Sequence, residues 1–183
     1  MELLEVVTDI ADALKSIDST LAAFKDFQPG VGPYGEPQLV KLVAEHLNGS
    51  PSYVQGVKTK RTPDLLIAGF WAIEIKLARP FGDNGRPAEN WSVNLLHPYS
   101  GNTSLLGDCL KLRSYSCREQ KAVVVIGYEH DPPQIDLEPL MRSFELIARD
   151  VLSVNLGERI SATRTKLVHP VHQQVKVVGW AVP

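Results

Sequence analysis

The chain carries two carboxylates and one ammonium at a spacing that could bring them together. Asp64 precedes a short apolar run, and Glu74 and Lys76 follow it in a segment where apolar residues alternate with others. Alternation with a period of two is typical of a β-strand, so Glu74 and Lys76 are expected on one face. If residues 62–77 form two strands joined by a tight turn, Asp64 comes to lie beside Glu74.

Such a cluster predicts metal-dependent chemistry. Two neighbouring carboxylates repel each other, and a bound divalent cation removes that conflict. Carboxylate oxygens and water suit Mg²⁺, and Mn²⁺ can substitute for it. Lys76 is a poor metal ligand but a good neighbour for developing negative charge. Together these groups suit the in-line hydrolysis of a phosphodiester bond.

The same residues resemble the signature of the PD-(D/E)xK nuclease superfamily. Pro63-Asp64 is followed, after nine residues, by Glu74-Ile75-Lys76. The resemblance covers residues 29–128. It implies an α/β, restriction-endonuclease-like fold, with a central mixed β-sheet flanked by helices. It also implies a Mg²⁺-dependent DNA endonuclease of restriction-like type, in which Asp64 and Glu74 hold the metal.

The resemblance implies roles for two further groups. The first core helix of this superfamily often carries a glutamate that joins the metal site, and Glu36 fits that place, with Glu45 as the alternative in the same helix. An acid at a helix N-terminus also interacts well with the helix dipole, so Glu36 fits a structural role too. Lys76 is expected to orient or help deprotonate the attacking water and to stabilise the charge on the phosphorane.

Other interpretations of these residues exist. A Glu-x-Lys triplet on a strand can be a solvated edge with a weak surface ion pair, and an aspartate before a strand is an ordinary turn residue. The alternative function is a non-catalytic nucleic-acid-binding or assembly protein with the same fold. A protein–protein module is a third possibility, based on the N-terminal apolar stripe and the acidic balance.

Any contact with DNA must come from a local basic patch, because the formal net charge is −2. One basic run directly precedes Asp64, and a long loop, residues 79–101, follows the strand that bears Lys76. This loop could contact substrate or close as a lid, or it could be a surface excursion with Trp91 in the core. The expected nucleic-acid contacts are Lys58, Lys60, Arg61, Arg79 and Arg86.

The sequence predicts a cytoplasmic protein without a membrane segment. No apolar run is long enough to span a bilayer, and the N-terminus lacks a signal-peptide pattern. The two cysteines, Cys109 and Cys117, fall in one predicted helix at a separation too large for a disulfide. Free thiols are typical of a reducing compartment.

The length predicts a single nuclease-like domain. Residues 1–27 form an amphipathic helical segment with a break near residues 16–20. Its apolar stripe packs on its own domain or forms a coiled-coil seam. A homodimer is expected, because one active site of this kind cuts one strand and two-fold pairing supplies the second.

The remaining elements divide into a catalytic core, residues 29–128, and a C-terminal part, residues 129–183. In the helix expected over residues 103–119, Asp108 and Lys111 are predicted to point outward. The other predicted elements are a glycine-rich loop (28–35), a helix ending at Asn48, a short strand (52–57), a buried strand (121–128), a helix (137–152) and two strands (159–165 and 175–182).

Two other patterns do not support further sites. Gly30, Gly32 and Gly35 match G-x-G-x-x-G, but a helix precedes them and a proline interrupts them, so a dinucleotide site is not expected. His169 and His172 are two possible ligands without a partner close in the sequence, which does not make a zinc site.

Overall fold

Strands rich in Val, Ile and Leu place a six-stranded sheet at the centre of the protein. The computed structural model describes residues 1–99 and 104–183. Its helices are α1 (Leu3–Asp18), α2 (Glu36–Asn48), α3 (Val93–Leu96), α4 (Leu105–Ser114) and α5 (Glu138–Asp150), with a 3₁₀ turn at Pro51–Tyr53. Its strands are β1 (Val57–Thr59), β2 (Leu65–Ile67), β3 (Trp71–Ala78), β4 (Gln120–Glu129), β5 (Ile160–Arg164) and β6 (Gln174–Ala181).

The sheet is mixed and its strand order is β1-β2-β3-β4-β6-β5. Only β3 and β4 pair in parallel, and they are linked through α3 and α4. The other neighbours are antiparallel. The prediction of an α/β protein with a central mixed sheet flanked by helices is therefore confirmed.

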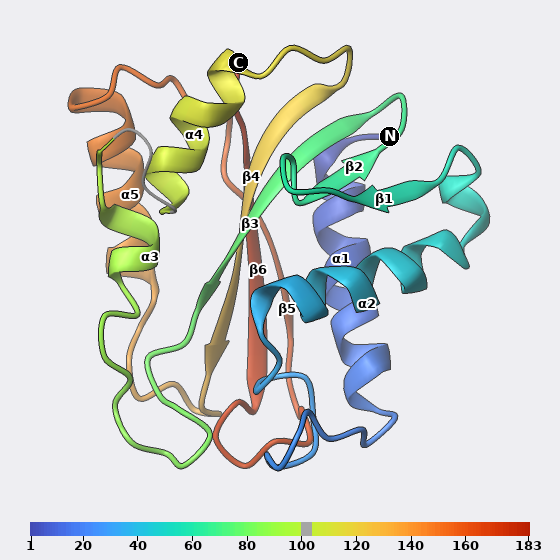
Figure 1. Cartoon of the computed structure of the whole chain (residues 1–183). Helices are drawn as coiled ribbons and strands as arrows, with labels where there is room; N and C mark the ends of the chain where they lie inside the picture. The colour runs from blue at the N-terminus through green and yellow to red at the C-terminus, as the bar shows by residue number, and fades with distance from the viewer. Residues whose placement is uncertain (100–103) are drawn as a thin grey trace.

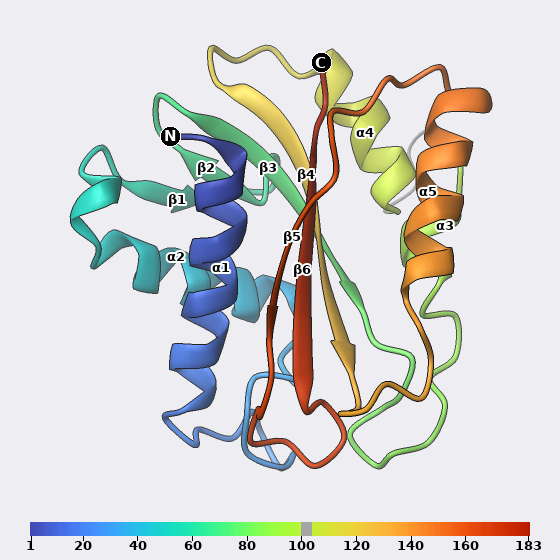
Figure 2. The ribbon, with the colours of Figure 1, turned by 180° about the vertical axis from the view of Figure 1, so that it is seen from behind.

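Helices cover both faces of the sheet, and each face has its own apolar core (Figures 1 and 2). On one face, α1 and α2 pack against residues such as Ile73, Ile75 and Val124. On the other, α3, α4 and α5 pack against residues such as Ala78, Val123 and Val125. The central strands β3 and β4 are buried almost throughout, as expected for strands covered on both sides.

The N-terminal helix is shorter than predicted and packs on its own chain. α1 ends at Asp18, close to the break expected near residues 16–20, and Leu21 and Lys25 then have positive φ angles that do not continue a helix. The apolar stripe of α1 is buried against the sheet. It is therefore unavailable as a coiled-coil seam, and that interpretation was wrong.

Asp18 fixes the glycine-rich loop to the end of α1. Its side chain is 1% exposed. One oxygen accepts a hydrogen bond from the backbone N–H of Val31 at 3.1 Å, and the other from Val168 at 2.8 Å. Gly32 is needed in this loop because a Cβ there would overlap the ring of His172. Gly32 thus has a packing role in this loop.

Several other boundaries differ from expectation. Residues 51–53 form a 3₁₀ turn, and the short strand starts only at Val57. α4 ends at Ser114, so Cys117 lies beyond the helix that holds the buried Cys109. Within the long loop, Trp91 is partly buried against the core under α3–α5. The predicted end of that loop at Gly101 and the predicted helix start at Thr103 lie outside the described residues.

Among the helices of residues 1–99 and 104–183, none combines the length and the apolar character that a membrane span requires.

His172 is a buried neutral histidine. Its ring is 2% exposed, stacks on His169 and donates through Nε2 to the carbonyl oxygen of Phe81 at 3.0 Å. Burial lowers the pKa of His172 to about 4, with smaller effects from Phe81, His169, Arg79 and Asp83. Between pH 4 and 6.5 the unfolded chain therefore binds a proton at this residue that the folded chain does not.

The free energy of unfolding should consequently fall as the pH falls through that window. We expect His172→Asn to lower stability at pH 7. It should also remove about 2 kcal/mol of the stability loss that the wild type shows between pH 7 and pH 5. Urea unfolding at both pH values measures this. The exposed His46→Asn should keep the wild-type difference, and the same difference in His172→Asn would contradict the assignment.

Candidate active site

The site forms beside the part of β3 that extends beyond its pairing with β2. Pairing with β2 covers only Trp71–Ile73 of β3, with Leu65 opposite Ile73. Beyond Ile73 the edge of β3 is open, and its backbone N–H groups need other acceptors. Asp64 Oδ2 accepts the N–H of Ile75 at 2.8 Å, which holds this carboxylate beside the strand. The hairpin predicted from the sequence therefore places Asp64 as expected.

Glu36 reaches the same open edge from the first turn of α2. Its Oε1 accepts a hydrogen bond from Lys76 Nζ at 3.0 Å. Lys76 is 8% exposed, because its chain lies under α4. Glu45, the alternative in the same helix, instead forms an exposed pair with Lys41. The structure thus brings Glu36, and not Glu45, to the site.

Two residues of α4, Asp108 and Lys111, complete a buried charge cluster. Asp108 is 1% exposed, and its two oxygens lie 3.2 Å from Lys76 Nζ and 2.8 Å from Lys111 Nζ. Lys111 Nζ also lies 3.0 Å from Glu74 Oε1. Asp108 was expected to point outward, and that prediction was wrong because α4 lies directly over the Glu74 face of β3. Lys111 is exposed, as expected, although its Nζ reaches back to Glu74. The i,i+3 spacing of Asp108 and Lys111 alone does not distinguish this arrangement from a surface pair.

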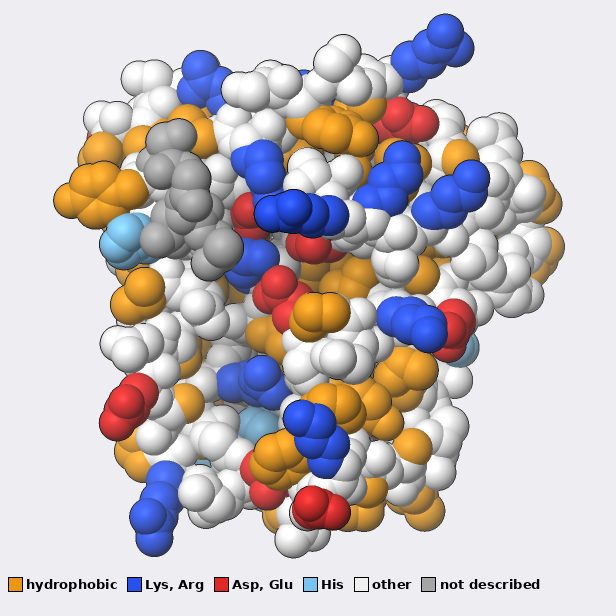
Figure 3. Space-filling model, in the orientation of Figure 1, with side chains coloured by type: hydrophobic (Ala, Val, Ile, Leu, Met, Phe, Trp, Pro, Cys, Tyr) orange, Lys and Arg blue, Asp and Glu red, His pale blue; other side chains and the backbone are white. Residues whose placement is uncertain are grey.

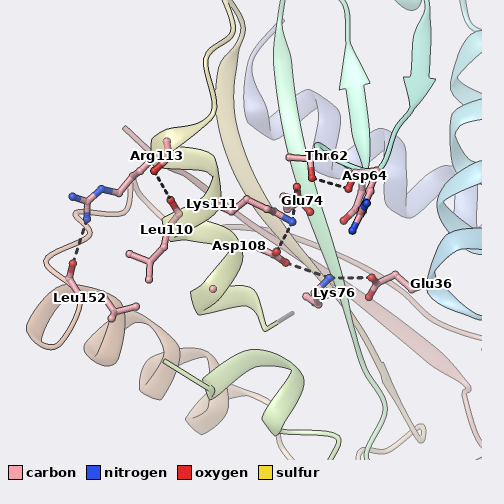
Figure 4. Close-up of a pocket in the computed structure, with 13 residues that line it drawn as sticks. Glu36, Thr62, Asp64, Glu74, Lys76, Asp108, Leu110, Lys111, Arg113 and Leu152 are labelled. Atoms are coloured by element: carbon pink, nitrogen blue, oxygen red, sulfur yellow. Dashed lines mark hydrogen bonds and ion pairs between the residues drawn. The ribbon is translucent and has the colours of Figure 1, made fainter. Parts of the chain in front are cut away.

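These side chains surround one cavity of about 980 Å³. Figure 4 shows Glu36, Lys76, Asp108 and Lys111 directed toward one another, with Asp64 and Glu74 beside them. In the space-filling view, acidic and basic side chains gather at a hollow on this face (Figure 3). The other residues that line the cavity are Arg61, Thr62, Gly107, Leu110, Arg113, Ser114 and Leu152.

Burial makes ionisation of the two buried carboxylates, Glu74 and Asp108, less favourable. Burial, followed by the charges of Asp64 and Asp108, raises the pKa of Glu74 above its usual range, although Lys111 acts in the opposite direction and favours the charged form. Burial also raises the pKa of Asp108, partly offset by Lys76 and Lys111. A cation at this position would remove the conflict between desolvation and charge.

In the two lysines, unlike in the carboxylates, the surroundings favour the charged form. Burial lowers the pKa of Lys76, but the charges of Asp108 and Glu36 outweigh it, so the pKa lies above its usual range. For Lys111, burial is likewise outweighed by Asp108 and Glu74, and its pKa is raised. Both lysines are therefore cationic at neutral pH.

The donor set of the cavity suits a hard divalent cation. Its ligating atoms are carboxylate oxygens, and two of them, Glu74 Oε1 and Asp108 Oδ2, are buried without a well-aligned hydrogen bond despite their lysine neighbours. In residues 1–99 and 104–183, no three His, Cys, Asp or Glu side chains already form a group that could hold one metal ion. Lysine nitrogens instead pair with Glu36, Glu74 and Asp108.

The predicted nucleic-acid contacts separate into two groups. Arg61 lines the main cavity and, with Lys60, an adjoining one of about 360 Å³, and Lys58 is exposed on β1 nearby. Arg79 instead donates to the carbonyl oxygens of Gly32 and Tyr34 at 2.8 and 3.2 Å, so its guanidinium secures the glycine-rich loop. Arg86 is exposed in the long loop and is not part of the main cavity's lining.

Comparison of the chain with protein-family models, with curated proteins and with solved structures finds no match in any of the three.

Asp108 should be the main structural support of the cluster, because it pairs with both lysines. Asp108→Asn keeps the volume and removes the charge, which leaves Lys76 undercompensated. Breaking a buried pair in this way should lower the free energy of unfolding by about 3 kcal/mol. Chemical denaturation at pH 7 measures the change. Asp26→Asn, at an exposed position, should have almost no effect, and an equally small effect of Asp108→Asn would refute the assignment.

Proposed function

We propose that this protein is a Mg²⁺-dependent endonuclease that hydrolyses phosphodiester bonds in DNA. The observation that carries the proposal is that Asp64, Glu74 and Lys76, singled out by residue type and spacing, line one cavity together with Glu36, the glutamate that the resemblance implies. Three carboxylates and a buried lysine at the open edge of a strand are costly for stability. That cost is understandable if the groups bind a cation and a phosphate.

The residues would divide the chemistry among them. Asp64 and Glu74 would hold Mg²⁺, or Mn²⁺ in its place, and Glu36 would complete the site directly or through water. When bound, the cation polarises the phosphate and favours formation of hydroxide from water. Lys76 lies between Glu36 and Asp108 and would orient the attacking water and stabilise charge on the phosphorane.

The remaining parts of the proposal follow from the resemblance to PD-(D/E)xK nucleases. The fold would be of the restriction-endonuclease-like type, consistent with its mixed sheet flanked by helices. The protein would act as a homodimer so that two sites cut the two strands. The N-terminal stripe cannot supply the dimer interface, because it is buried within the chain.

The metal ligands can be tested by comparing stability and cleavage. Asp64→Asn should abolish plasmid nicking and the rise in melting temperature that Mg²⁺ gives the wild type, because a ligand that binds only the folded state stabilises it. Lys76→Ala removes no ligand, so Mg²⁺ should still stabilise it while hydrolysis falls by orders of magnitude. Melting curves with and without Mg²⁺ and a nicking assay measure both effects.

A wild-type melting temperature that ignores Mg²⁺ and Mn²⁺, together with no nicking, would refute the nuclease. The non-catalytic nucleic-acid-binding protein of the same fold would then be the better explanation. Glu45→Gln provides a control, since Glu45 lies on the exposed side of the helix that carries Glu36.

Substrate binding should depend on Arg61 at the rim of the cavity. Arg61→Ala should weaken DNA binding and reduce the dependence of log K on log salt by about 0.9, the amount expected for one lost phosphate contact. Fluorescence anisotropy across salt concentrations measures the slope. Arg142→Ala, an exposed arginine paired with Glu138 on α5, is the matched control. Equal slopes for Arg61→Ala and the wild type would exclude a phosphate contact at this residue.

A further inference from the structure

Lys111 occupies an unusual position in the cavity. Its Nζ lies 3.0 Å from Glu74 Oε1 and 2.8 Å from Asp108 Oδ1, between two side chains that are each 1% exposed. The lysine side chain itself is 40% exposed. A cationic group with access to solvent therefore compensates the charge of buried carboxylates, as a metal ion would.

Lys76 differs from Lys111 in how firmly it is held. Lys76 Nζ has three oxygen neighbours, on Glu36, Asp108 and the backbone of Ile75, and its side chain is only 10% exposed. Lys111 Nζ has two, on Glu74 and Asp108, and its side chain is 40% exposed. Of the two lysines, Lys111 can leave the cluster toward solvent with less loss of bonding.

We propose that Lys111 is the resident counter-ion of Glu74 and that a divalent cation must displace its ammonium group to bind there. This inference rests on the proposed function. An ammonium close to Glu74 repels an approaching cation and competes with it for the same oxygen. Once displaced, Lys111 stays on α4 at the cavity wall with Arg113 and Ser114, where it can contact the phosphate of the substrate. The protein thus exchanges an internal cation for an external one.

The exchange predicts that removing the lysine charge favours metal binding. In Lys111→Met, which keeps the length of the side chain, half-maximal thermal stabilisation should need about tenfold less Mn²⁺ or Mg²⁺ than in the wild type. The metal-free variant should melt at a lower temperature, because Glu74 and Asp108 lose a partner. Lys41→Met, an exposed lysine paired with Glu45, should require the same cation concentration as the wild type.

A second measurement uses the wild type and does not depend on how the variant folds. Reductive methylation followed by mass spectrometry reports the reactivity of each lysine. Lys111 should be modified faster when Mg²⁺ is present, and Lys41 should be unaffected. The proposal is overturned if cations stabilise the wild type but leave Lys111 reactivity unchanged, or if Lys111→Met needs as much cation as the wild type. A wild type that does not respond to cations would instead refute the proposed function itself.

Discussion

The early end of β2 is the constraint on which the site depends. Because β2 pairs with β3 only as far as Ile73, the following part of β3 is a central strand with one open edge. Backbone N–H groups in such a place must find acceptors. Asp64 supplies one to Ile75, and Glu36 reaches the same edge of β3 to pair with Lys76. One carboxylate is thus held beside Glu74 and Lys76 by the ordinary requirement of backbone hydrogen bonding, and a second by an ion pair, before any ligand is considered.

The second constraint is charge balance in a buried place. Glu74 and Lys76 lie on the face of β3 that α4 covers, so their desolvation must be offset from α4. Asp108 and Lys111 provide an acid and a base at successive turns and convert four isolated charges into a chain of ion pairs. Such a chain is weak support for stability, since an apolar core would do as well. The presence of these ion pairs at a solvent-accessible cavity is consistent with a site whose charged groups bind a ligand.

Sequence reasoning located the residues of β3 at the centre of the site, but not the residues of α4 that cover them. The period-two alternation around Glu74 and Lys76, and the hairpin before it, determine local geometry, so the grouping with Asp64 was predictable. Glu36 was expected only through the resemblance, from its place at the start of the first core helix. Asp108 was assigned to the wrong side, and the contact of the exposed Lys111 with Glu74 was not foreseen, because a helix stripe does not reveal which polar residues flank it over a neighbouring strand. The contacts of Arg79 within the fold were not foreseen for a similar reason, since its partners are carbonyl oxygens of a loop far away in the sequence.

The packing of α1 has a consequence for how the protein is made. This helix, near the start of the sequence, packs on β5 and β6, near its end, and Asp12 and Asp18 bind Arg164 and the backbone of Val168 there. During synthesis, the apolar stripe of α1 is covered only once β5 and β6 have left the ribosome. A nascent chain that already contains the cavity residues of β3 and α4 still lacks this layer, so the stability of the fold depends on strands that do not line the cavity.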